Sequence, residues 1–372
     1  MKIIIAHVSA GAGHRKAAEA LYHYLKKNKP EIEIRIIDVL EGSNFLFRFF
    51  YTKGYFFLVN YCLGLWAFAF WATQLKIFSG FNKSLGLSIG KLNTGHFLKL
   101  LVKENPDFVI STHFLPSEIT AYLKGKRKIT SNLITVITDF GVHPFWLSRG
   151  TDIYAVASGF TAEQLKGMGV DPKRIMVFGI PVDQKFSAVG YDRWSLRHKL
   201  GLAQEKFTVL LITGSFGIGP IEEISEALHN DCQVIAVCAS NKRLYARLQK
   251  RDIPGVKVYG FVNNVEELMA VSDIIITKPG GMTVSEVLAM ELAPIFISAI
   301  PGQEEFNIQA MASYGIGRQA RDIAEIRRIV LDYKNDPQKL KQVKEKIKAV
   351  KKPLAAQELI NAICTGGFRP AD

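Results

Sequence analysis

Glycines and a hydroxyl side chain follow one short apolar run in a pattern that suits phosphate binding. Residues 273–277 (DIIIT) are mostly β-branched, as in a buried strand of a parallel sheet, and Gly280 and Gly281 come soon after. Because the glycines lack a Cβ, a ligand can approach the backbone there, and a helix is expected from Val284 to Met290 with Thr283 at its mouth. The N–H groups and positive end of such a helix attract anions, so this segment predicts a phosphate site.

A polar cluster follows the next expected strand, residues 294–297. Its members are amide and carboxylate side chains: Gln303, Glu304, Glu305 and Asn307. Such groups hydrogen-bond well to hydroxyls. Together with the phosphate site, they predict a ligand that combines phosphate with a hydroxyl-rich part. For Glu304 and Glu305, a solvated loop without a ligand is the alternative.

A second glycine turn opens the chain, where Gly11, Gly13 and His14 stand between an apolar strand (KIIIAH) and an alanine-rich helix. Such a turn is typical of the first crossover of a doubly wound sheet, where ligands gather at the carboxyl ends of the strands. A nicotinamide dinucleotide site is one interpretation, because Asp38 ends the next strand. Lys16 replaces the third glycine of that fingerprint and prevents close helix–strand packing, which disfavours this interpretation.

Several motifs, in order from about residue 4 to residue 310, carry a resemblance to a known family. They are SAGAGHRKAAEAL, TDFGVHPFW, VFGIPVDQKF, YGFVNNVEELM and KPGGMTVSEVLAM followed by PGQEEFN. In this order and spacing the sequence resembles the monogalactosyldiacylglycerol synthase and processive diacylglycerol glucosyltransferase family. The family consists of inverting, UDP-sugar-dependent GT-B enzymes related to the GlcNAc transferase that makes lipid II. The match is weakest over residues 43–80.

The resemblance implies an α/β protein of the GT-B type, with two Rossmann-like domains facing a central cleft. We expect an acceptor and membrane domain at 1–185, with a hydrophobic insertion at about 45–81. A linker at 186–204, a UDP-sugar domain at 205–350 and a returning C-terminal helix at 351–372 follow. The apolar runs predict strands near 3–8, 32–39, 107–112, 133–138, 153–157, 175–179, 207–213, 233–238, 256–259, 273–277 and 294–297.

Inverting transfer needs a base beside the acceptor hydroxyl, and His14 is the first candidate, by its position and by the resemblance. The positive end of its helix disfavours the imidazolium form, and a base must be neutral. A histidine that merely caps the turn is the alternative. Asp139 is the second candidate, able to orient or replace His14. His113, with Gly11 and Gly13, is expected to line the acceptor side, and His143 is a weaker candidate.

The same resemblance assigns the donor site. Gly280, Gly281 and Thr283, with Gly214 and Ser215 after another strand, would supply N–H groups for the diphosphate, and Lys278 would add a positive charge. Glu286, expected in the first turn of its helix, would bind the ribose hydroxyls. The remaining contacts would come from Phe261 and Val262 on the uracil and from Gln303, Glu304 and Asn307 on the sugar. No metal ion or other cofactor is implied. Both glycine turns have an alternative interpretation as ordinary strand–helix connections.

Aromatic residues crowd the insertion, and residues 54–75 carry no charge. Aromatic side chains along the whole segment suit a position at a membrane interface, and a membrane-inserting helix or hairpin is favoured over a buried lid or a true span. The expected membrane contacts are Phe56, Phe57, Trp66, Phe70 and Trp71. Nearby lysines and arginines would meet anionic lipid headgroups.

Charge and cysteine usage agree with this interpretation. Lys and Arg total 47 against 34 Asp and Glu, a net charge of +13, which suits an anionic partner. No nucleic-acid-binding signature is present, so an anionic membrane fits better. The basic segment 339–352 is expected to be a solvated helix, with headgroup contact as the alternative. The four cysteines lack metal-like or paired spacing, which indicates reduced thiols and a peripheral enzyme on the cytoplasmic face of a membrane.

The sequence therefore predicts a membrane-associated glycosyltransferase that moves a hexose from a UDP-sugar to diacylglycerol. Two alternatives remain. One is another GT-B enzyme, such as a UDP-sugar 2-epimerase or a polyprenyl-linked GlcNAc transferase. The other is a non-catalytic membrane-bound UDP-sugar sensor.

Overall fold

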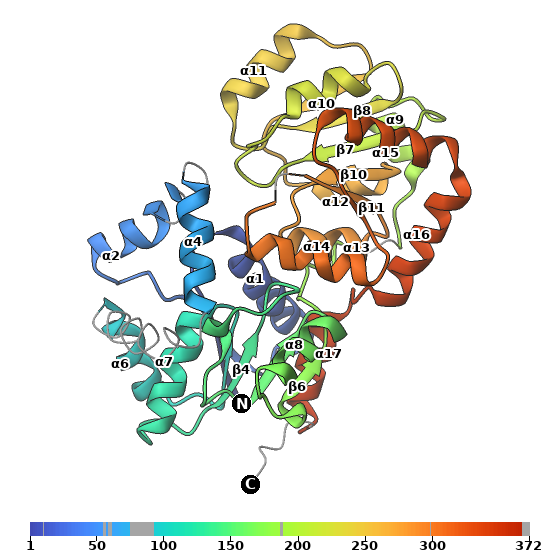
Figure 1. Cartoon of the computed structure of the whole chain (residues 1–372). Helices are drawn as coiled ribbons and strands as arrows, with labels where there is room; N and C mark the ends of the chain where they lie inside the picture. Colours follow the sequence, from blue (N-terminus) through green and yellow to red (C-terminus); the bar gives the residue numbers. More distant parts are fainter. Residues whose placement is uncertain are drawn as a thin grey trace. The chain divides into compact units, whose positions relative to one another are not determined.

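The computed structural model describes residues 1–9, 11–54, 57–58, 62–74, 93–186, 189–297 and 299–366. Packing divides the chain into two units (Figure 1). Unit 1 comprises Met1–Gln184, Ile300–Phe306 and Leu354–Asp372, and unit 2 comprises Lys185–Ala299 and Asn307–Pro353. Residues 300–306, expected within the sugar domain, thus pack with the first unit.

Unit 1 is built on a parallel sheet, and its described strands run in the order β2-β1-β3-β4-β5-β6. The strands are β1 (Lys2–His7), β2 (Glu33–Asp38), β3 (Phe108–Ser111), β4 (Asn132–Val136), β5 (Ile153–Val156) and β6 (Ile175–Val177). Ala6 of β1 pairs with Ser111 of β3, so the segments that follow these two strands emerge at the same edge of the sheet. This register brings His14 close to residues 112 and 113.

Helices cover both faces of this sheet, as in a doubly wound fold. On one face, α1 (Ala12–Asn28) and α17 (Ala355–Cys364) bury Leu21 and Leu359 against the strands. On the other face, α6 (Gly95–Glu104) and α7 (Phe114–Gly125) bury Phe97 and Ile119. The sheet therefore has two apolar layers that fix the ends of β1 and β3.

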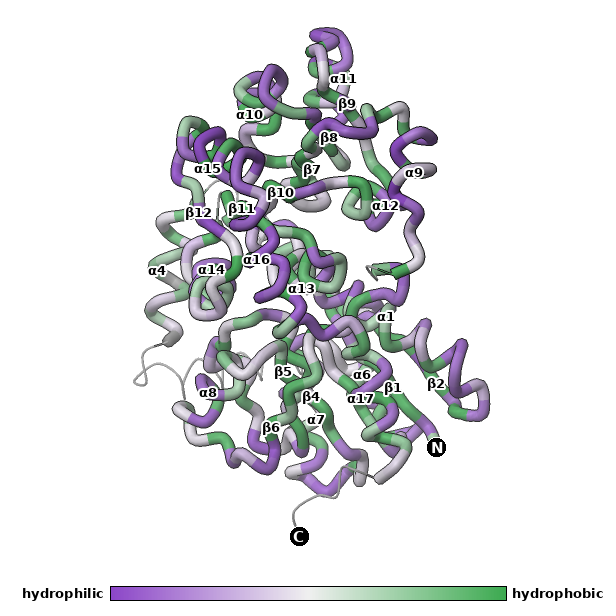
Figure 2. Tube along the Cα trace, turned by 90° about the vertical axis from the view of Figure 1, so that its right-hand side faces the viewer, coloured by the Kyte–Doolittle hydropathy of each residue, from purple (hydrophilic) through white to green (hydrophobic). Residues whose placement is uncertain are grey.

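The smaller elements of unit 1 connect these layers or lie outside them. They are α2 (Phe45–Phe49), the π-helical turn η1 (Phe50–Gly54), α4 (Leu63–Gln74), the 3₁₀ turns η2 (Pro144–Trp146) and η3 (Pro172–Arg174), and α8 (Gly159–Gly167). Figure 2 draws α4 almost entirely in hydrophobic and intermediate colours, in contrast to α11 and α16, which carry long stretches in the hydrophilic colour.

Unit 2 repeats the architecture with a second parallel sheet, whose described strands run in the order β12-β11-β10-β7-β8-β9. They are β7 (Thr208–Ile212), β8 (Gln233–Val237), β9 (Val256–Tyr259), β10 (Ile274–Thr277), β11 (Ala293–Phe296) and β12 (Arg318–Gln319). Thr277 pairs with Ile212, so the glycine turns after β10 and β7 leave the sheet side by side.

The helices of unit 2 are α9 (Arg193–Lys199), α10 (Ile221–Leu228), α11 (Lys242–Arg251), α12 (Val265–Ala270), α13 (Gly281–Ala289), α15 (Ile323–Asn335) and α16 (Pro337–Val350). The helix α14 (Gln303–Ser313) begins in the 300–306 segment of unit 1 and continues into unit 2. One face of the sheet is covered by α10, α11 and α15, which bury Ile224, Leu248 and Ile329.

The structure differs from the sequence predictions in three local details. The helix expected at 284–290 begins at Gly281, because Gly280 has the extended backbone of an N-cap (φ −66°, ψ 137°). The two-residue strand β12 was not predicted. The expected linker segment contains α9, and Arg197 of that helix is buried and donates to the backbone oxygen of Val271 (Nε···O 3.1 Å).

Candidate functional site

His14 is held by Thr112 through two hydrogen bonds near the end of β3. The Nδ1 atom of His14 lies 2.8 Å from the backbone oxygen of Thr112, and Thr112 Oγ1 donates to the backbone oxygen of His14 over 2.8 Å. Thr138 Oγ1 also lies 2.8 Å from Nδ1. His14 therefore does not cap its own helix, whose N-cap is Gly11 (φ 119°) and has no side-chain cap.

These contacts determine which nitrogen of His14 carries the proton. A backbone oxygen accepts hydrogen bonds and never donates them, so Nδ1 must be the protonated nitrogen when it binds Thr112. The neutral ring then has its lone pair on Nε2. Burial, the largest cause, lowers the pKa of His14 from 6.5 to about 4, and the hydrogen bond to Thr112 opposes this only in part. At neutral pH, His14 is a neutral imidazole with a basic Nε2.

The two other histidines near this site use Nδ1 in the opposite sense. His113 is the N-cap of α7, and its Nδ1 accepts from the N–H of Leu115 (3.1 Å). His143 caps η2 in the same way, accepting from Phe145 N–H (3.2 Å). Burial lowers the pKa of both rings, to about 4 for His143. When neutral, each carries its proton on Nε2 and lacks the free lone pair that a base requires.

The ring of His113 nevertheless lies against His14, with centroids 4.6 Å apart in an edge-to-face arrangement. His113 thus lines the surroundings of the candidate base, while its own nitrogen caps a helix. Sequence reasoning missed Thr112 and Thr138, the residues that hold the His14 ring. The polar end of the third strand was the available signal.

Asp139 and Gln303 are joined directly within unit 1. Gln303 Nε2 donates to Asp139 Oδ2 over 3.0 Å, and Asp139 is 7% exposed. Asp139 directly follows Thr138, which contacts His14. Two adjacent residues thus contact the candidate base and Gln303 of the expected sugar-binding cluster. The structure therefore brings Asp139, Gln303 and the surroundings of His14 into one unit.

The other members of the polar cluster hold their own segment together. Glu304 Oε2 accepts from the N–H of Ile300 (2.8 Å), and Glu305 Oε2 accepts from the N–H of Gly302 (3.0 Å). Asn307 is fully buried in unit 2 and donates from Nδ2 to the backbone oxygen of Pro279 (2.8 Å). Asn307 thus supports the glycine turn at 280–281.

The start of α13 is well suited to an anion. Gly280 provides no side-chain cap, the first turn contains no acidic residue, and the N–H of Val284 donates to the backbone oxygen of Gly280 (2.9 Å). The N–H groups of Gly281 and Thr283 belong to this uncapped turn, and the positive helix end adds to their attraction for phosphate. Lys278 precedes the turn and is partly exposed.

The turn after β7 is a less favourable anion site. Gly214 has φ 89°, and Ser215 beside it is exposed. The helix that follows, α10, carries Glu222 and Glu223 in its first turn, which disfavours an anion at its N-terminus. The buried hydroxyl of Thr213 has no hydrogen-bond partner in the described part of the chain. Thr213 is a third residue that the sequence did not indicate, after Thr112 and Thr138, and a polar ligand group would satisfy its hydroxyl.

The remaining donor candidates lie in unit 2 at different depths. Phe261 is 68% exposed at the surface, and Val262 beside it is partly buried. Glu286 is buried and stands in the second turn of α13, not in the first turn as the sequence suggested, because the helix starts earlier.

The aromatic insertion leaves large apolar side chains exposed. Phe57 is 55% exposed and Trp71 is 59% exposed, whereas Trp66 and Phe70 are partly buried. Phe56 lies outside the described residues. Within the part of the chain that can be described, no helix has both the length and the apolar character needed to cross a membrane.

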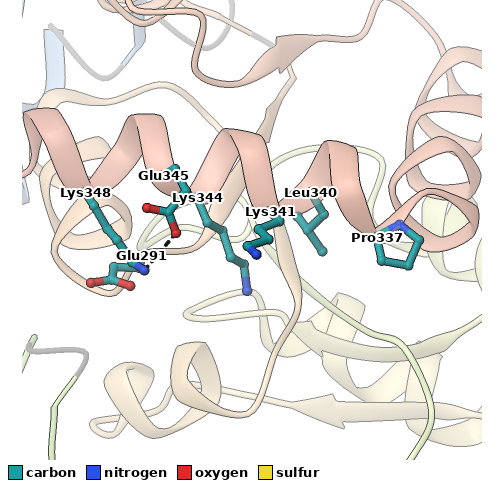
Figure 3. Close-up of a pocket in the computed structure, with 7 residues that line it drawn as sticks. All are labelled: Glu291, Pro337, Leu340, Lys341, Lys344, Glu345 and Lys348. Carbon is teal, nitrogen blue, oxygen red and sulfur yellow. Dashed lines mark hydrogen bonds and ion pairs between the residues drawn. The ribbon is translucent and has the colours of Figure 1, made fainter.

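A hollow of about 390 Å³ lies along α16 in unit 2 (Figure 3), and no candidate residue lines it. Three lysines face it, Lys341, Lys344 and Lys348, but Glu345 pairs with Lys348 over 3.0 Å. Burial lowers the pKa of Lys344. The mixed charges of this hollow give no reason to place the reaction there. Among the residues that the structure describes, no cluster of three or more His, Cys, Asp or Glu side chains could hold a metal ion.

Comparisons with known proteins agree with the two halves of the fold. Residues 14–182 match the family model of monogalactosyldiacylglycerol (MGDG) synthase, and residues 221–359 match that of the glycosyltransferase family 28 C-terminal domain. Among solved structures, MurG from Acinetobacter baumannii has a TM-score of 0.62 at 14% identity and covers 98% of this chain, with 99% of its own chain covered. A UDP-N-acetylglucosamine 2-epimerase has a TM-score of 0.59 at 15% identity, with coverage of 100% and 98%.

Two parallel α/β units of this kind define the GT-B class, which transferases and epimerases share. Sequence similarity goes further. A processive diacylglycerol beta-glucosyltransferase from Bacillus cereus is 30% identical in an alignment 370 residues long that covers 97% of this chain and 93% of the relative. The chain therefore belongs to the monogalactosyldiacylglycerol synthase and processive diacylglycerol glucosyltransferase family.

Proposed function

We propose that this protein transfers a hexose from a UDP-sugar to the free hydroxyl of diacylglycerol at a membrane surface, with inversion at the anomeric carbon. The observation that carries the proposal is the tautomer of His14. Its Nδ1 is bound to the backbone oxygen of Thr112, which leaves a neutral Nε2 lone pair available. Family membership supplies the substrate class, since the relative from Bacillus cereus is named for diacylglycerol glucosyl transfer.

In the reaction, the acceptor hydroxyl attacks the anomeric carbon while the bond from that carbon to the diphosphate oxygen breaks. His14 Nε2 takes the hydroxyl proton, and UDP leaves as an anion. We assign Asp139 an orienting role beside the sugar, because it accepts a hydrogen bond from Gln303, one of the residues that we assign to the sugar.

The donor is held mainly by residues of the KPGGMTVSEVLAM and PGQEEFN motifs. The uncapped start of α13, with Gly280, Gly281 and Thr283, stabilises the diphosphate, as backbone N–H groups do for developing negative charge, and Lys278 adds its charge. Three further sets complete the site: Glu286 on the ribose, Phe261 and Val262 on the uracil, and Gln303 and Glu304 on the sugar. Gly214 and Ser215 make a secondary phosphate contact, and Asn307 supports the turn through Pro279.

The acceptor comes from the membrane. Exposed side chains on α2 and α4, including Phe45, Phe68 and Trp71, would insert among lipids together with the exposed Phe57. The net charge of +13 favours anionic headgroups. The four cysteines are free of disulfides, which suits a peripheral enzyme on the cytoplasmic face.

Purified protein, diacylglycerol in anionic vesicles, and UDP-glucose or UDP-galactose in separate reactions test the proposal. We expect lipid-linked hexose, with UDP-glucose the better donor, because the relative that aligns over nearly the whole chain is a glucosyltransferase. Epimerised UDP-sugar without glycolipid would indicate the epimerase alternative, and UDP-sugar binding without turnover would indicate a sensor.

A further inference from the structure

The helix α4 has two apolar faces with different surroundings. Leu65, Phe68 and Trp71 are 59%, 65% and 59% exposed and follow one another at helical spacing. Trp66, Phe70 and Thr73 are partly buried on the other side. One face is therefore free to meet lipid, and the other packs against the protein.

The inner face of α4 packs on residues close to the proposed sugar-binding cluster. The ring of Phe70 lies 4.7 Å from the ring of His143 and 6.4 Å from that of Phe306, measured between centroids. Thr73 Oγ1 lies 3.1 Å from His143 Nε2, and as His143 Nδ1 is an acceptor, Nε2–H donates to the threonine. These contacts all lie within unit 1.

Phe70 covers a glycine that directly precedes the cluster. Gly302 has φ 82°, and a Cβ added to it would lie 2.2 Å from Cδ1 of Phe70. Such a separation is far below van der Waals contact, so the ring occupies the space that a side chain would need. The backbone of Gly302 and the ring of Phe70 are thus in direct contact.

The segment beneath Phe70 carries the residues that we assign to the sugar. Gln303 follows Gly302 and binds Asp139, and Glu304 accepts from Ile300 N–H. A Cβ added to Gly141 would likewise lie 2.2 Å from the Cβ of Phe306. Residues 300–306 therefore contact both Phe70 and the 139–141 turn.

We propose that Phe70 is a positioning residue that links membrane docking of α4 to the sugar-binding segment 300–306. When the outer face of α4 enters the bilayer, the helix is fixed, and Phe70 then holds Gly302 and Gln303 in their working geometry. The inference rests on the proposed function for its substrates. It adds that use of the UDP-sugar depends on membrane docking, and that the side chain of Phe70 transmits this dependence.

The test compares Phe70→Ala, Phe70→Leu and Trp71→Ala with the wild-type protein, using vesicle flotation and UDP-glucose kinetics measured at limiting and at saturating vesicle concentrations. Phe70→Ala should float normally but lose kcat/KM for UDP-glucose by roughly tenfold to hundredfold, the scale expected for misplaced binding groups. Phe70→Leu should recover part of the loss. Trp71→Ala should float poorly, and more vesicles should restore its rate. Equal behaviour of Phe70→Ala and Trp71→Ala would overturn the inference.

A double-mutant cycle probes the contact itself. Gly302→Ala should impair kcat/KM through the clash with Phe70 and through its positive φ, and in the Phe70→Ala background its effect should shrink because the space is open. Additive effects would show that the two positions are not coupled.

Hydrogen exchange separates this inference from the proposed function. Anionic vesicles should slow amide exchange across 300–306 in the wild-type protein but not in Phe70→Ala, whether or not glycolipid is made. If that protection is seen while no donor yields glycolipid, the proposed function fails and the link stands. If glycolipid forms but vesicles leave exchange at 300–306 unchanged, the link fails and the function stands.

Discussion

Replacing His14 with alanine should remove the catalytic base while leaving the UDP site in unit 2 intact. General-base catalysis contributes about 10²- to 10⁴-fold to a rate, so kcat should fall by that factor, or roughly 3–5 kcal/mol in the activation free energy. The affinity for UDP should not change. His23→Ala is the matched control, because His23 lies on the same helix and is exposed.

The pH dependence of wild-type activity gives a second, independent test of His14, because it reports the pKa of the base. The base works when deprotonated, and burial lowers the pKa of His14 to about 4, so the acid limb of activity moves down in pH. At pH 5.5 a group with this pKa is about 97% neutral, whereas a histidine with the ordinary value of 6.5 would be about 9% neutral. Activity at pH 5.5 should therefore stay close to that at pH 7.5.

The assay is transfer of radiolabelled hexose to diacylglycerol vesicles at saturating donor, with kcat measured from pH 4 to pH 8 for the wild type, His14→Ala and His23→Ala. A loss of less than about tenfold in His14→Ala, below the range of general-base catalysis, would refute the assignment. An acid limb near pH 6.5 in the wild type would contradict the lowered pKa of His14, because it would mean that burial does not hold the ring in its neutral form.

Three further predictions test separate parts of the structure. Thr283→Asp places a negative charge in the uncapped turn of α13, and isothermal titration should show weaker UDP binding by about tenfold; unchanged affinity would remove the diphosphate from this turn. Glu286→Gln should raise the KM for UDP-sugar by about tenfold or more, because a charged hydrogen bond contributes about 1.5–3 kcal/mol, and an unaltered KM would contradict the ribose assignment. The free energy of unfolding should fall as the pH drops from 6.5 to 4, because His14 and His143 bind protons in the unfolded chain but not when buried. Each of the two histidines should lower it by on the order of 3 kcal/mol over this range. Urea unfolding of His143→Asn, which keeps a cap acceptor, should show a shallower decline, and an equal slope would mean that His143 does not titrate this way.

The strands could be predicted because buried parallel strands are continuous β-branched runs, as in Ile274–Thr277. The strand β12 has only two residues, too few for any pattern to appear. The sequence predicted that α13 begins at Val284, because a glycine pair usually indicates a turn. In the structure Gly281 already belongs to the helix.

The roles of the histidines could not be predicted from the sequence. His14, His113 and His143 each stand beside a strand end or turn, and only their bonds distinguish a base from two helix caps. His14 and Thr112 are separated by 98 residues in sequence, and Gln303 and Asp139 by 164, so no local pattern reports these contacts. Likewise, α4 is apolar on all sides, and its inner face became evident only from what Phe70 touches.

Mass spectrometry of the lipids formed from purified enzyme, diacylglycerol vesicles and each UDP-sugar in turn is the most direct test of hexose transfer to a lipid acceptor. We predict a diacylglycerol species heavier by one hexose residue, formed in the wild type and His23→Ala and strongly reduced in His14→Ala. Absence of any hexose-bearing lipid with every donor would contradict the account, as would equal amounts of product in the wild type and His14→Ala.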